Sequence, residues 1–277
     1  MTRRACVIGW PAAHSRSPMI HGYWLEQAGI EGAYERASVS PDEFPDFVRR
    51  LRDHGFVGAN VTIPHKEAAL RLVDEATETA RALGAVNTLW FENGRLRGDN
   101  TDVPGFLAHL DASAPGWDAE PGTAMVLGAG GAARAVIFAL KSRGLSEIRV
   151  VNRTRERAER LAESFGPPVA AFGWEAAEEA LAGARLLVNT TSLGMAGQPP
   201  LELDLAPLRP DAIVYDIVYV PLETALLRTA RARGLRTVDG LGMLLHQAVP
   251  GFARWFGITP QVTAELHDLV AADIEGR

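Results

Sequence analysis

Short apolar runs alternate with amphipathic stretches along most of the chain. The β-branched runs predict buried strands, and stretches with apolar residues three or four positions apart predict helices. The predicted strands are residues 5–9, 34–39, 57–63, 124–127, 148–151, 169–172, 185–188 and 212–217. Strands that alternate with helices favour an α/β fold with a parallel, doubly wound sheet.

The predicted helices mostly end near a glycine, which is typical of helix C-termini. They are residues 18–28, 41–54, 75–83, 134–142, 155–165, 174–181, 221–233, 241–255 and 260–274, with two more beginning near residues 66 and 105. The helices predicted at residues 241–255 and 260–274 resemble neither sheet nor crossover, so we expect them to return to the first domain or to bridge the two domains. Asn93-Gly94 between two apolar runs predicts a β-hairpin.

A glycine-rich loop between a strand and a helix is the most specific motif of the chain. Gly128, Gly130 and Ala133 form a Gly-x-Gly-x-x-Ala turn. The first glycine permits a tight turn, the second lets a pyrophosphate approach the backbone, and the small third residue allows close helix packing. The motif predicts a dinucleotide site, against the alternative of a merely tight turn.

The residues after the next strand indicate which dinucleotide binds. NAD sites usually carry Asp or Glu there. This chain instead has Asn152-Arg-Thr-Arg-Glu-Arg157. Guanidinium groups bind a phosphate bidentately, so NADP is favoured, with Arg153 and Arg157 as main candidates and Arg155 as a further one. The alternative is a solvated helix start, although cations there oppose the helix dipole unless they meet an anion.

Composition limits the classes of partner and compartment. The net charge of −6 indicates no basic surface, so we expect no nucleic-acid partner. No apolar run approaches the ~20 residues of a membrane helix, and we expect no membrane partner. The single cysteine, Cys6, cannot form an internal disulfide, which fits a reducing compartment and a cytoplasmic protein. The histidines show no metal-ligand spacing with Cys6 or with each other, so we expect no metal. A homodimer is compatible with the sequence.

Lys66 is a candidate for proton transfer. Lys66 and Lys141 are the only lysines among 28 basic residues, and Lys66 lies at a predicted helix start after a Thr-Ile-Pro turn. Lysine can give and take a proton, whereas arginine stays charged. The alternative is an ordinary surface lysine, which we expect Lys141 to be.

Two carboxylates could partner this lysine. Asp102 ends a polar string at the domain boundary that we place near residue 103, and Asp99 lies in the same string. Asp102 could instead cap the helix that follows. Residue chemistry alone does not decide whether Asp99 or Asp102 is the carboxylate that partners Lys66.

Ser15 and Ser17 lie beside a predicted helix start. Ser17 followed by Pro18 is typical of an N-cap, so capping is its structural alternative. Ser15 has no such role. Two hydroxyls beside a helix N-terminus suit an anion.

Taken together, these segments resemble the shikimate dehydrogenase family over nearly the whole chain. The matching strings are HSRSP (14–18), NVTIPHK (60–66), GAVNT (84–88), GDNTD (98–102), GAGGA (128–132), NRT (152–154), NTTS (189–192), Tyr219 with Pro221, and GLGMLLHQ (240–247). Each string is weak alone, whereas their order and spacing make the resemblance specific. It implies an α/β substrate domain (residues 1–103 and 240–277) whose C-terminal helices return to it. Residues 104–239 would form a Rossmann-like NADP-binding domain.

The resemblance also implies the activity and the residues that carry it. The reaction would be the reversible NADPH-dependent reduction of 3-dehydroshikimate to shikimate, in aromatic amino-acid and chorismate precursor synthesis. Lys66 and Asp102 would be the acid/base pair, which decides between the two carboxylates. The implied substrate-binding residues are Ser15, Ser17, Thr62, Asn87, Asp102, Tyr219 and Gln247. The implied cofactor-binding residues are Gly128, Ala129, Gly130, Gly131, Ala132, Asn152, Arg153, Thr154, Arg157, Ile217 and Gly240.

Three alternatives are weighed against this function. A quinate/shikimate dehydrogenase of the same fold tends to change the serine pair or to carry an acidic residue after the second strand, and this chain does neither. A non-catalytic NADP-binding regulator would not need Lys66 and Asp102. A folate-pathway dehydrogenase of similar shape would not need Ser15 and Ser17. We therefore favour shikimate and NADP.

Overall fold

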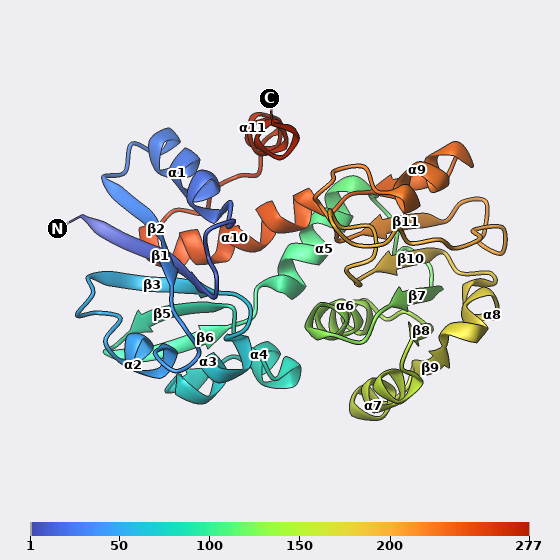
Figure 1. The fold of residues 1–277 in the computed structure, drawn as a ribbon, viewed down its shortest axis with the longest axis horizontal. Helices are drawn as coiled ribbons and strands as arrows, with labels where there is room; N and C mark the ends of the chain where they lie inside the picture. The colour runs from blue at the N-terminus through green and yellow to red at the C-terminus, as the bar shows by residue number, and fades with distance from the viewer. Residues whose placement is uncertain (1, 277) are drawn as a thin grey trace. The chain divides into compact units, whose positions relative to one another are not determined.

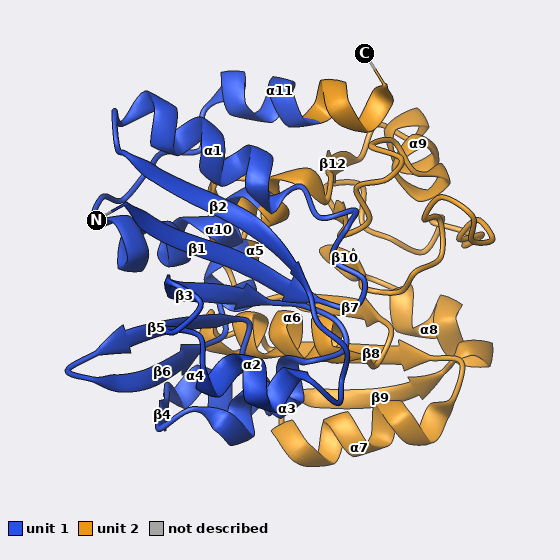
Figure 2. Cartoon of the chain, turned by 60° about the vertical axis from the view of Figure 1, so that its left-hand side comes forward, with its two compact units in different colours: residues 1–105, 245–270 blue, residues 106–244, 271–277 orange. Residues whose placement is uncertain are grey.

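The computed structural model describes residues 2–276, which form two units with one sheet each (Figure 1, Figure 2). The first unit contains the residues up to Gly105 together with Leu245–Val270. The second contains Phe106–Leu244 together with the residues from Ala271 onward. The first unit is thus discontinuous in sequence, because a C-terminal segment rejoins it.

Six strands of the described chain form the sheet of the first unit, in the order β2-β1-β3-β5-β6-β4. Their bounds are β1 Arg3–Gly9, β2 Gly32–Ser38, β3 Phe56–Val61, β4 Glu75–Ala76, β5 Thr88–Glu92 and β6 Arg95–Asp99. β1 runs parallel to β2 and β3, whereas β5 is antiparallel to β3 and β6. Asn93 and Gly94 join β5 to β6 with φ of 50° and 79°. Two consecutive positive φ angles are typical of a tight hairpin turn, so the predicted hairpin is confirmed.

Two helices of the first unit are shorter than the sequence predicts. The helices up to residue 83 are α1 Ser17–Gln27, α2 Phe44–Arg49, α3 Lys66–Leu72 and α4 Glu78–Leu83. The helix predicted at 41–54 is reduced to α2, with turns after Arg49. The helix predicted at 75–83 begins at Glu78, because Glu75–Ala76 pair with β6 and the Thr77 hydroxyl caps the helix by accepting from the Ala80 amide at 3.2 Å.

Three helices pass from one unit to the other along the chain. They are α5 Asp102–Ser113, α10 Leu241–Phe256 and α11 Ala264–Glu275. Within the first unit, Trp255 of α10 donates from Nε1 to the Leu89 carbonyl oxygen at 2.9 Å. Trp24 of α1 donates to the Gln261 carbonyl oxygen at 3.0 Å. These contacts confirm the prediction that the C-terminal helices return to the first domain.

Six parallel strands of the described chain form the second sheet, in the order β12-β11-β10-β7-β8-β9. They are β7 Thr123–Leu127, β8 Glu147–Asn152, β9 Val169–Gly173, β10 Leu186–Asn189, β11 Ile213–Asp216 and β12 Arg236–Val238. β7 is the first strand of this sheet in sequence, and β8 and β9 follow outward on one side of it. β10, β11 and β12 then follow outward on the other side of β7. This is the strand order of a doubly wound dinucleotide fold, whose switch point lies between β7 and β10. The predicted α/β fold is confirmed. The sequence does not predict β12, whose three residues are too few for a recognisable period.

The helices of the second unit flank its sheet. They are α6 Gly131–Ser142, α7 Arg155–Phe165, α8 Ala177–Leu181, which follows a short 3₁₀ turn, and α9 Ala225–Ala232. The bounds of α7 are those predicted. The helix predicted from residue 221 begins instead at Ala225, because the Thr224 hydroxyl caps it by accepting from the Leu227 amide at 3.3 Å.

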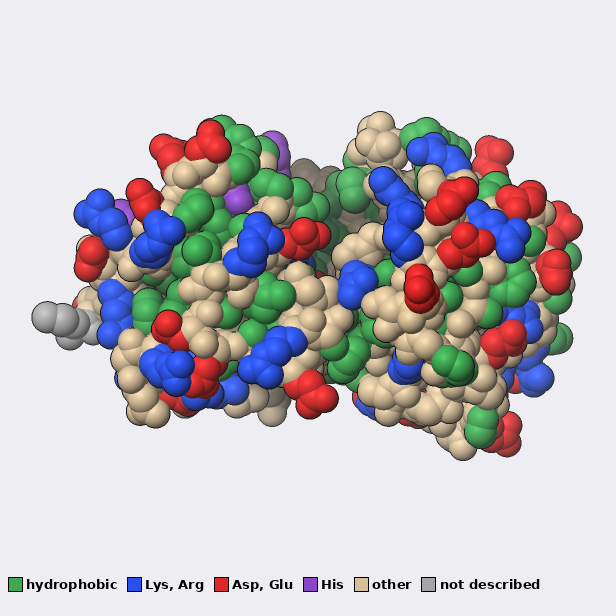
Figure 3. Space-filling model, turned by 90° about the horizontal axis from the view of Figure 1, so that it is seen from below, with side chains coloured by type: hydrophobic (Ala, Val, Ile, Leu, Met, Phe, Trp, Pro, Cys, Tyr) green, Lys and Arg blue, Asp and Glu red, His purple; other side chains and the backbone are tan. Residues whose placement is uncertain are grey.

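Charged side chains of both signs are scattered over the face of the molecule that Figure 3 shows. Acidic and basic side chains are interspersed there over both units, which agrees with the small net charge of −6. Over residues 2–276, no helix is both long enough and apolar enough to span a membrane.

A cluster of aromatic rings from α1, β2 and α10 surrounds His21 in the first unit. The imidazole stacks on Tyr34 with ring centroids 4.0 Å apart, and on Phe252 at 5.9 Å. His21 is fully buried, and neither ring nitrogen has a hydrogen-bond partner among the described residues. Burial lowers the pKa of His21 to about 3, opposed in part by the nearby Asn60 side chain. The ring is therefore neutral in the folded protein at neutral pH.

We expect His21 to make the protein less stable in acid. Its pKa is about 3 when folded, against an ordinary value of 6.5. Between these pH values the unfolded chain binds one proton more, so the free energy of unfolding falls as the pH drops through this window. The contribution is roughly 2 to 3 kcal/mol between pH 7 and pH 4.5.

Urea unfolding of wild type and His21→Phe at both pH values measures this contribution. The phenyl ring keeps the stacking and removes the titration, so the variant should lose less stability on acidification. His54→Phe, at an exposed position, is the matched control and should follow wild type. An identical acid loss in His21→Phe and wild type would contradict the assignment.

Candidate active site

Lys66 and Asp102 form an ion pair in the first unit. Lys66 is the first residue of α3, and Asp102 is the first residue of α5. Lys66 Nζ donates to Asp102 Oδ2 at 2.6 Å. The Asp102 side chain is 11% exposed and the Lys66 side chain 30%, so the pair is shielded on the carboxylate side and reachable on the ammonium side.

Asn87 holds the second oxygen of the same carboxylate. Asn87 Nδ2 donates to Asp102 Oδ1 at 2.9 Å. Asn87 Oδ1 accepts from the Thr101 amide at 2.8 Å and from Thr88 Oγ1 at 2.9 Å. Because a backbone amide can only donate, the Asn87 oxygen must face Thr101, and its NH₂ group must face Asp102. Both carboxylate oxygens therefore accept from fixed donors.

Asp99 faces a different part of the first unit. Its Oδ1 accepts from Thr77 Oγ1 at 2.5 Å and from the Asn100 amide at 2.7 Å. The oxygens of Asp102 are engaged by Lys66 and Asn87 rather than by the backbone of α5. The structure thus pairs Asp102 with the lysine and gives Asp99 the role of supporting the start of α4.

The two serines lie side by side at the start of α1. Ser15 Oγ donates to Ser17 Oγ at 3.2 Å, and the Ser17 amide donates to Ser15 Oγ at 3.3 Å. Arg36 anchors the loop by donating to the Ser15 carbonyl oxygen at 2.7 and 3.0 Å. Arg16, not Ser17, holds the N-cap position of α1, so the N-cap interpretation of Ser17 is wrong. Paired hydroxyls at a helix N-terminus suit an anionic group.

Thr62 and Gln247 each lie where two backbone segments of the first unit come close together. Thr62 follows β3, and its amide donates to the Ile8 carbonyl oxygen at 2.9 Å. Gln247 of α10 packs against the first turn of α5, where a Cβ on Gly105 would lie 2.6 Å from Gln247 Cβ. Gly105 is three residues after Asp102, on the same helix face. Gln247 therefore borders the helical turn that carries Asp102.

The glycine loop of the second unit fits a nucleotide. The predicted loop residues follow β7 directly: Gly128, Ala129 and Gly130 join it to α6, and Gly131 and Ala132 are the first two residues of α6. Gly128 has a φ of +104°, and a Cβ there would lie 2.8 Å from Thr190 Oγ1. A Cβ on Gly130 would meet nothing within 4 Å, so this side of the loop is open to a ligand. Ala133 is fully buried against the fold. The first amides of α6 have no partner within the helix and attract anions.

The arginines after β8 differ in their partners. Asn152 Nδ2 donates to the Thr154 carbonyl oxygen at 2.8 Å and closes the turn before α7. Arg155 forms an ion pair with Glu159 at 3.0 Å on the same helix. Arg153 and Arg157 are exposed, and within residues 2–276 neither has an ion-pair partner. Their guanidinium groups are therefore available to a phosphate, whereas that of Arg155 is occupied.

Asp216, at the end of β11, fixes the segment that follows it. Its Oδ1 accepts from Asn189 Nδ2 at 2.9 Å and from the Val218 amide at 3.1 Å, and its Oδ2 accepts from Thr224 Oγ1 at 2.7 Å. Burial raises the pKa of this carboxyl, while the three donors act in the opposite direction. The sequence assigns Asp216 no role. Its one signal is an aspartate that ends an otherwise apolar strand.

This segment carries the remaining predicted residues of the second unit. A Cβ on Gly240 would lie 2.2 Å from the Ile217 carbonyl oxygen, so the two backbones touch at a position that only glycine allows. The Ile217 amide donates to the Asn189 carbonyl oxygen at 3.1 Å. Tyr219 follows on the same segment and is half-buried. The backbones of Ile217 and Gly240 are thus fixed by their close contact and by the bond to Asn189. A fixed backbone suits the cofactor-binding role that the sequence predicts for both residues.

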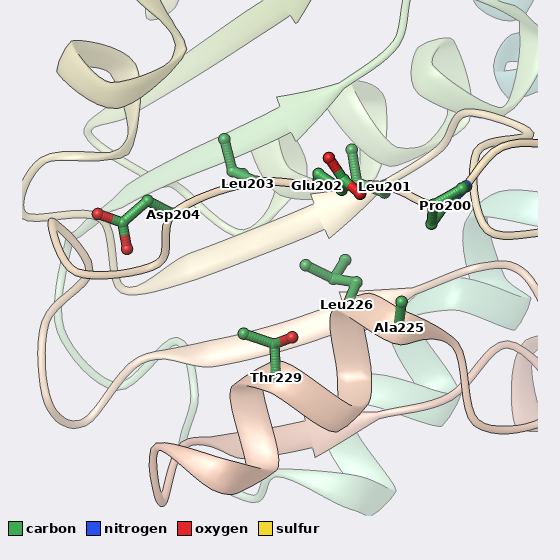
Figure 4. A pocket seen from close by; sticks show the side chains of 8 residues that line it. All are labelled: Pro200, Leu201, Glu202, Leu203, Asp204, Ala225, Leu226 and Thr229. Carbon is green, nitrogen blue, oxygen red and sulfur yellow. The ribbon is translucent and has the colours of Figure 1, made fainter.

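A groove of about 490 Å³ lies elsewhere in the second unit (Figure 4). It runs between the segment 200–204 and the start of α9, and its lining combines leucines with Glu202 and Asp204. No predicted site residue lines it, so it is not the candidate site. Over the part of the chain that the structure describes, no three His, Cys, Asp or Glu side chains are grouped to hold a metal ion.

Comparison with known proteins identifies the family. The model of the shikimate dehydrogenase substrate binding domain matches residues 7–89, and that of shikimate/quinate 5-dehydrogenase matches residues 113–195. The shikimate 5′-dehydrogenase C-terminal domain matches residues 240–264. A shikimate dehydrogenase (NADP(+)) of Azorhizobium caulinodans is 59% identical over 275 residues, which cover 99% of this chain and 98% of that protein. The chain belongs to the shikimate dehydrogenase family.

The family predicted from the sequence motifs is thus confirmed. A shikimate dehydrogenase (NADP(+)) of Methylocella silvestris is 63% identical over 272 residues, covering 98% of this chain and 97% of that protein. A solved structure of shikimate 5-dehydrogenase from Thermus thermophilus, in complex with NADP(H) and shikimate, has a TM-score of 0.86 at 41% identity and covers 99% of this chain and 100% of that one. A quinate dehydrogenase from Corynebacterium glutamicum in complex with NAD has a TM-score of 0.90 at 33% identity, with 98% and 99% covered. The same fold therefore occurs in solved structures named as shikimate dehydrogenase and as quinate dehydrogenase.

Proposed function

We propose that this member of the family catalyses the reversible NADPH-dependent reduction of 3-dehydroshikimate to shikimate. The observation that carries the proposal is the Lys66–Asp102 ion pair with Asn87 on the second carboxylate oxygen. Relatives with 59% and 63% identity are named NADP(+)-dependent shikimate dehydrogenases, which supports the oxidoreductase class and the cofactor. The chain then acts in aromatic amino-acid and chorismate precursor synthesis.

The substrate is held at its carboxylate and at its ring hydroxyls. Ser15 and Ser17, whose hydroxyls lie 3.2 Å apart, bind the carboxylate together with Tyr219. The residues proposed to bind the ring oxygens are Thr62, Asn87, Asp102 and Gln247. Several directed donors and acceptors discriminate well among substrates, because a substrate without the matching group leaves a buried polar atom unpaired.

Lys66 is the proposed proton donor in the reducing direction. NADPH, when bound, supplies the hydride that adds to the C3 carbonyl carbon of the substrate. The carbonyl oxygen gains negative charge, which the Lys66 ammonium stabilises and then neutralises with a proton. Asp102 holds the ammonium in place at 2.6 Å. In the oxidising direction, the amine of Lys66 takes the hydroxyl proton of shikimate and exchanges it with solvent.

The second unit binds the cofactor in this proposal. The open side of Gly130 receives the pyrophosphate at the start of α6. Arg153 and Arg157 bind the 2′-phosphate that distinguishes NADP from NAD, with Asn152 and Thr154 shaping the turn between them. Ile217 and Gly240 border the nicotinamide through their backbones. A cytoplasmic location and a homodimer stay predictions, and the buried, unpaired Cys6 supports the first of these.

Absorbance of NADPH tests the reaction. The purified protein with shikimate and NADP should produce NADPH faster than with quinate or with NAD. Lys66→Ala should lower kcat by about 10²- to 10⁴-fold, which is the usual contribution of a general acid–base group. Lys141→Ala is the matched control, because it removes the chain's other lysine, which donates to the Phe165 carbonyl oxygen on the second unit. Faster oxidation of quinate with NAD would contradict the proposed substrate and cofactor. Wild-type turnover in a folded Lys66→Ala variant would contradict the proposed role of Lys66.

A pair of isosteric variants separates the two carboxylates. Asp102→Asn removes the anion beside Lys66 and should lower kcat by about 10²-fold or more, because the amine loses the group that orients it. Asp99→Asn changes an acceptor of the Thr77 hydroxyl, so its kcat should stay near wild type while the melting temperature falls. Steady-state kinetics and thermal melts distinguish these outcomes. A larger kcat loss in Asp99→Asn would reverse the assignment.

Single arginine variants test the phosphate site. Arg153→Ala and Arg157→Ala should each raise the KM for NADP roughly tenfold or more, since a hydrogen bond to a charged group contributes about 1.5 to 3 kcal/mol. Their KM for NAD should not change, because NAD has no 2′-phosphate. Arg155→Ala is the matched control, and its existing pair with Glu159 predicts a KM for NADP near that of wild type. Equal effects of all three variants would argue against the chosen arginines.

A further inference from the structure

Asp216 is a buried carboxylate of the second unit that the proposed reaction does not use. It is fully buried at the end of β11 and directly precedes Ile217, whose backbone is proposed to border the nicotinamide. Within residues 2–276, no lysine, arginine or histidine forms an ion pair with it, and the α9 arginines Arg228 and Arg231 pair with Glu223 instead. A buried charge without a counterion acts beyond its own contacts, because water and salt screen it only weakly.

The hydrogen-bond partners of Asp216 stabilise its ionised form. Asn189 Oδ1 accepts from the Thr191 amide at 3.0 Å, so the Asn189 NH₂ group must face Asp216 Oδ1. The Val218 amide donates to the same oxygen, and Thr224 Oγ1 donates to Oδ2 at 2.7 Å. Thr224 is also the N-cap of α9, and this end of a helix dipole favours an anion. Three donors and a helix N-terminus thus hold the negative charge, against the effect of burial, which raises the pKa of this carboxyl.

Asp216 lies at the carboxyl ends of the parallel strands, the edge at which doubly wound sheets bind their ligands. β11 and β12 pair in parallel up to the residue before Asp216 and the residue before Asp239. Each of these aspartates directly precedes a residue proposed to border the nicotinamide, Ile217 and Gly240 respectively. A Cβ on Gly240 would lie 2.2 Å from the Ile217 carbonyl oxygen, so the two segments meet at one place. The backbone proposed to border the nicotinamide therefore lies in a negatively charged region.

The nicotinamide ring differs in charge between the two forms of the cofactor. The ring of NADP⁺ carries a positive charge, which is lost when a hydride adds to it, so the ring of NADPH is neutral. A fixed negative charge near the ring therefore binds the oxidised form more strongly than the reduced form. Apolar contacts and hydrogen bonds to the rest of the cofactor do not discriminate in this way, because the rest of the cofactor is the same in both forms.

We propose that the Asp216 carboxylate shifts the preference of the cofactor site toward NADP⁺, by attracting the positively charged nicotinamide ring. The proposal rests on the function proposed above, in which the backbones of Ile217 and Gly240 border that ring. Asp216 acts through its charge, from behind the Ile217 backbone. The same charge stabilises the transition state of substrate reduction, in which the ring becomes positive as the hydride leaves.

Asp216→Asn tests this preference, because it removes the charge and keeps the shape of the side chain. The amide oxygen can replace Oδ1, and the new NH₂ group can donate to the Thr224 hydroxyl, which is also an acceptor. The dissociation constant of NADP⁺ should rise roughly three- to tenfold, the order of effect of one elementary charge within a protein. That of NADPH should stay within about twofold of wild type. Isothermal titration calorimetry with each form of the cofactor measures both constants.

A cofactor fragment without the nicotinamide separates the effect of the charge from a distorted fold. Adenosine 2′,5′-bisphosphate carries the phosphate that Arg153 and Arg157 are proposed to bind, and it lacks the ring. Its dissociation constant should be the same for Asp216→Asn and wild type, because the charge acts on the ring. A merely structural defect would weaken the binding of NADP⁺, NADPH and the fragment alike, and that result would overturn the proposal.

Asp211→Asn is the matched control, because it also removes one negative charge from the second unit. Asp211 is exposed, lies two residues before β11 and pairs with Arg209 at 2.8 Å. It is thus at the opposite end of the strand from Asp216, where solvent screens its charge. Its ratio of the NADP⁺ and NADPH dissociation constants should equal that of wild type. An equal rise of this ratio in both aspartate variants, or an unchanged ratio in Asp216→Asn, contradicts the proposal.

Asp216→Ser keeps the proposal testable if the asparagine variant does not fold. A serine hydroxyl can accept from the amide two residues further along, as Asp216 does from Val218, and it carries no charge. The same rise of the ratio is expected, and an unchanged ratio again overturns the proposal. A wild type that binds neither cofactor form nor the fragment would refute the proposed function and the preference together. A wild type that binds both forms and oxidises shikimate, with an unchanged ratio in the Asp216 variants, refutes the preference alone.

Discussion

The orientation of one buried amide, that of Asn87, determines how the charged pair of the first unit is held. The Thr101 amide donates to Asn87 Oδ1, which leaves the NH₂ group for Asp102. A reversed amide would place its oxygen against a carboxylate and leave the Thr101 amide without an acceptor, at a cost of about 1 to 3 kcal/mol for each unpaired group. Asn87 and Thr101 are both buried, so water cannot relieve such a mismatch. The chemistry proposed for Lys66 thus depends on the orientation of an uncharged side chain, the Asn87 amide, which holds the carboxylate that pairs with the lysine.

The register of a hairpin brings these groups together. β5 and β6 pair with Thr88 opposite Asp99, so the residue before β5 meets the residues after β6. The Asn87 amide donates to the Asp99 carbonyl oxygen at 2.9 Å, which extends the ladder by one step. A slip of one residue would turn every side chain of a strand to the other face. The Asn93-Gly94 turn, at the far end of the hairpin, therefore helps to align Asn87 with Asp102.

Local signals explain which parts of the protein the sequence predicts well. The glycine loop, the hairpin turn and the bounds of α7 depend on residues close together in the chain, and the structure confirms them. Asp99 and Asp102 could not be separated by residue chemistry, because both belong to one polar string and only the fold decides which faces Lys66. The resemblance to the family chose Asp102, in agreement with the ion pair. The sequence does not predict the hydrogen bonds of Asp216 with Asn189 or of Tyr34 with Asn60, because these partners lie far away in the sequence and no local pattern marks them.

Tyr34 lies where two different environments of the first unit meet. Its ring belongs to the dry cluster around His21, where even the imidazole nitrogens have no partner among the described residues. Its hydroxyl belongs to the polar path that leads through Asn60 toward Asn87. A tyrosine suits such a boundary because one end of the side chain is apolar and the other end is polar. Phenylalanine would satisfy the cluster and leave the path without its first donor, whereas a small polar residue would do the reverse. Rigid aromatic packing on one side of Tyr34 can therefore hold hydroxyl and amide groups in place on the other side.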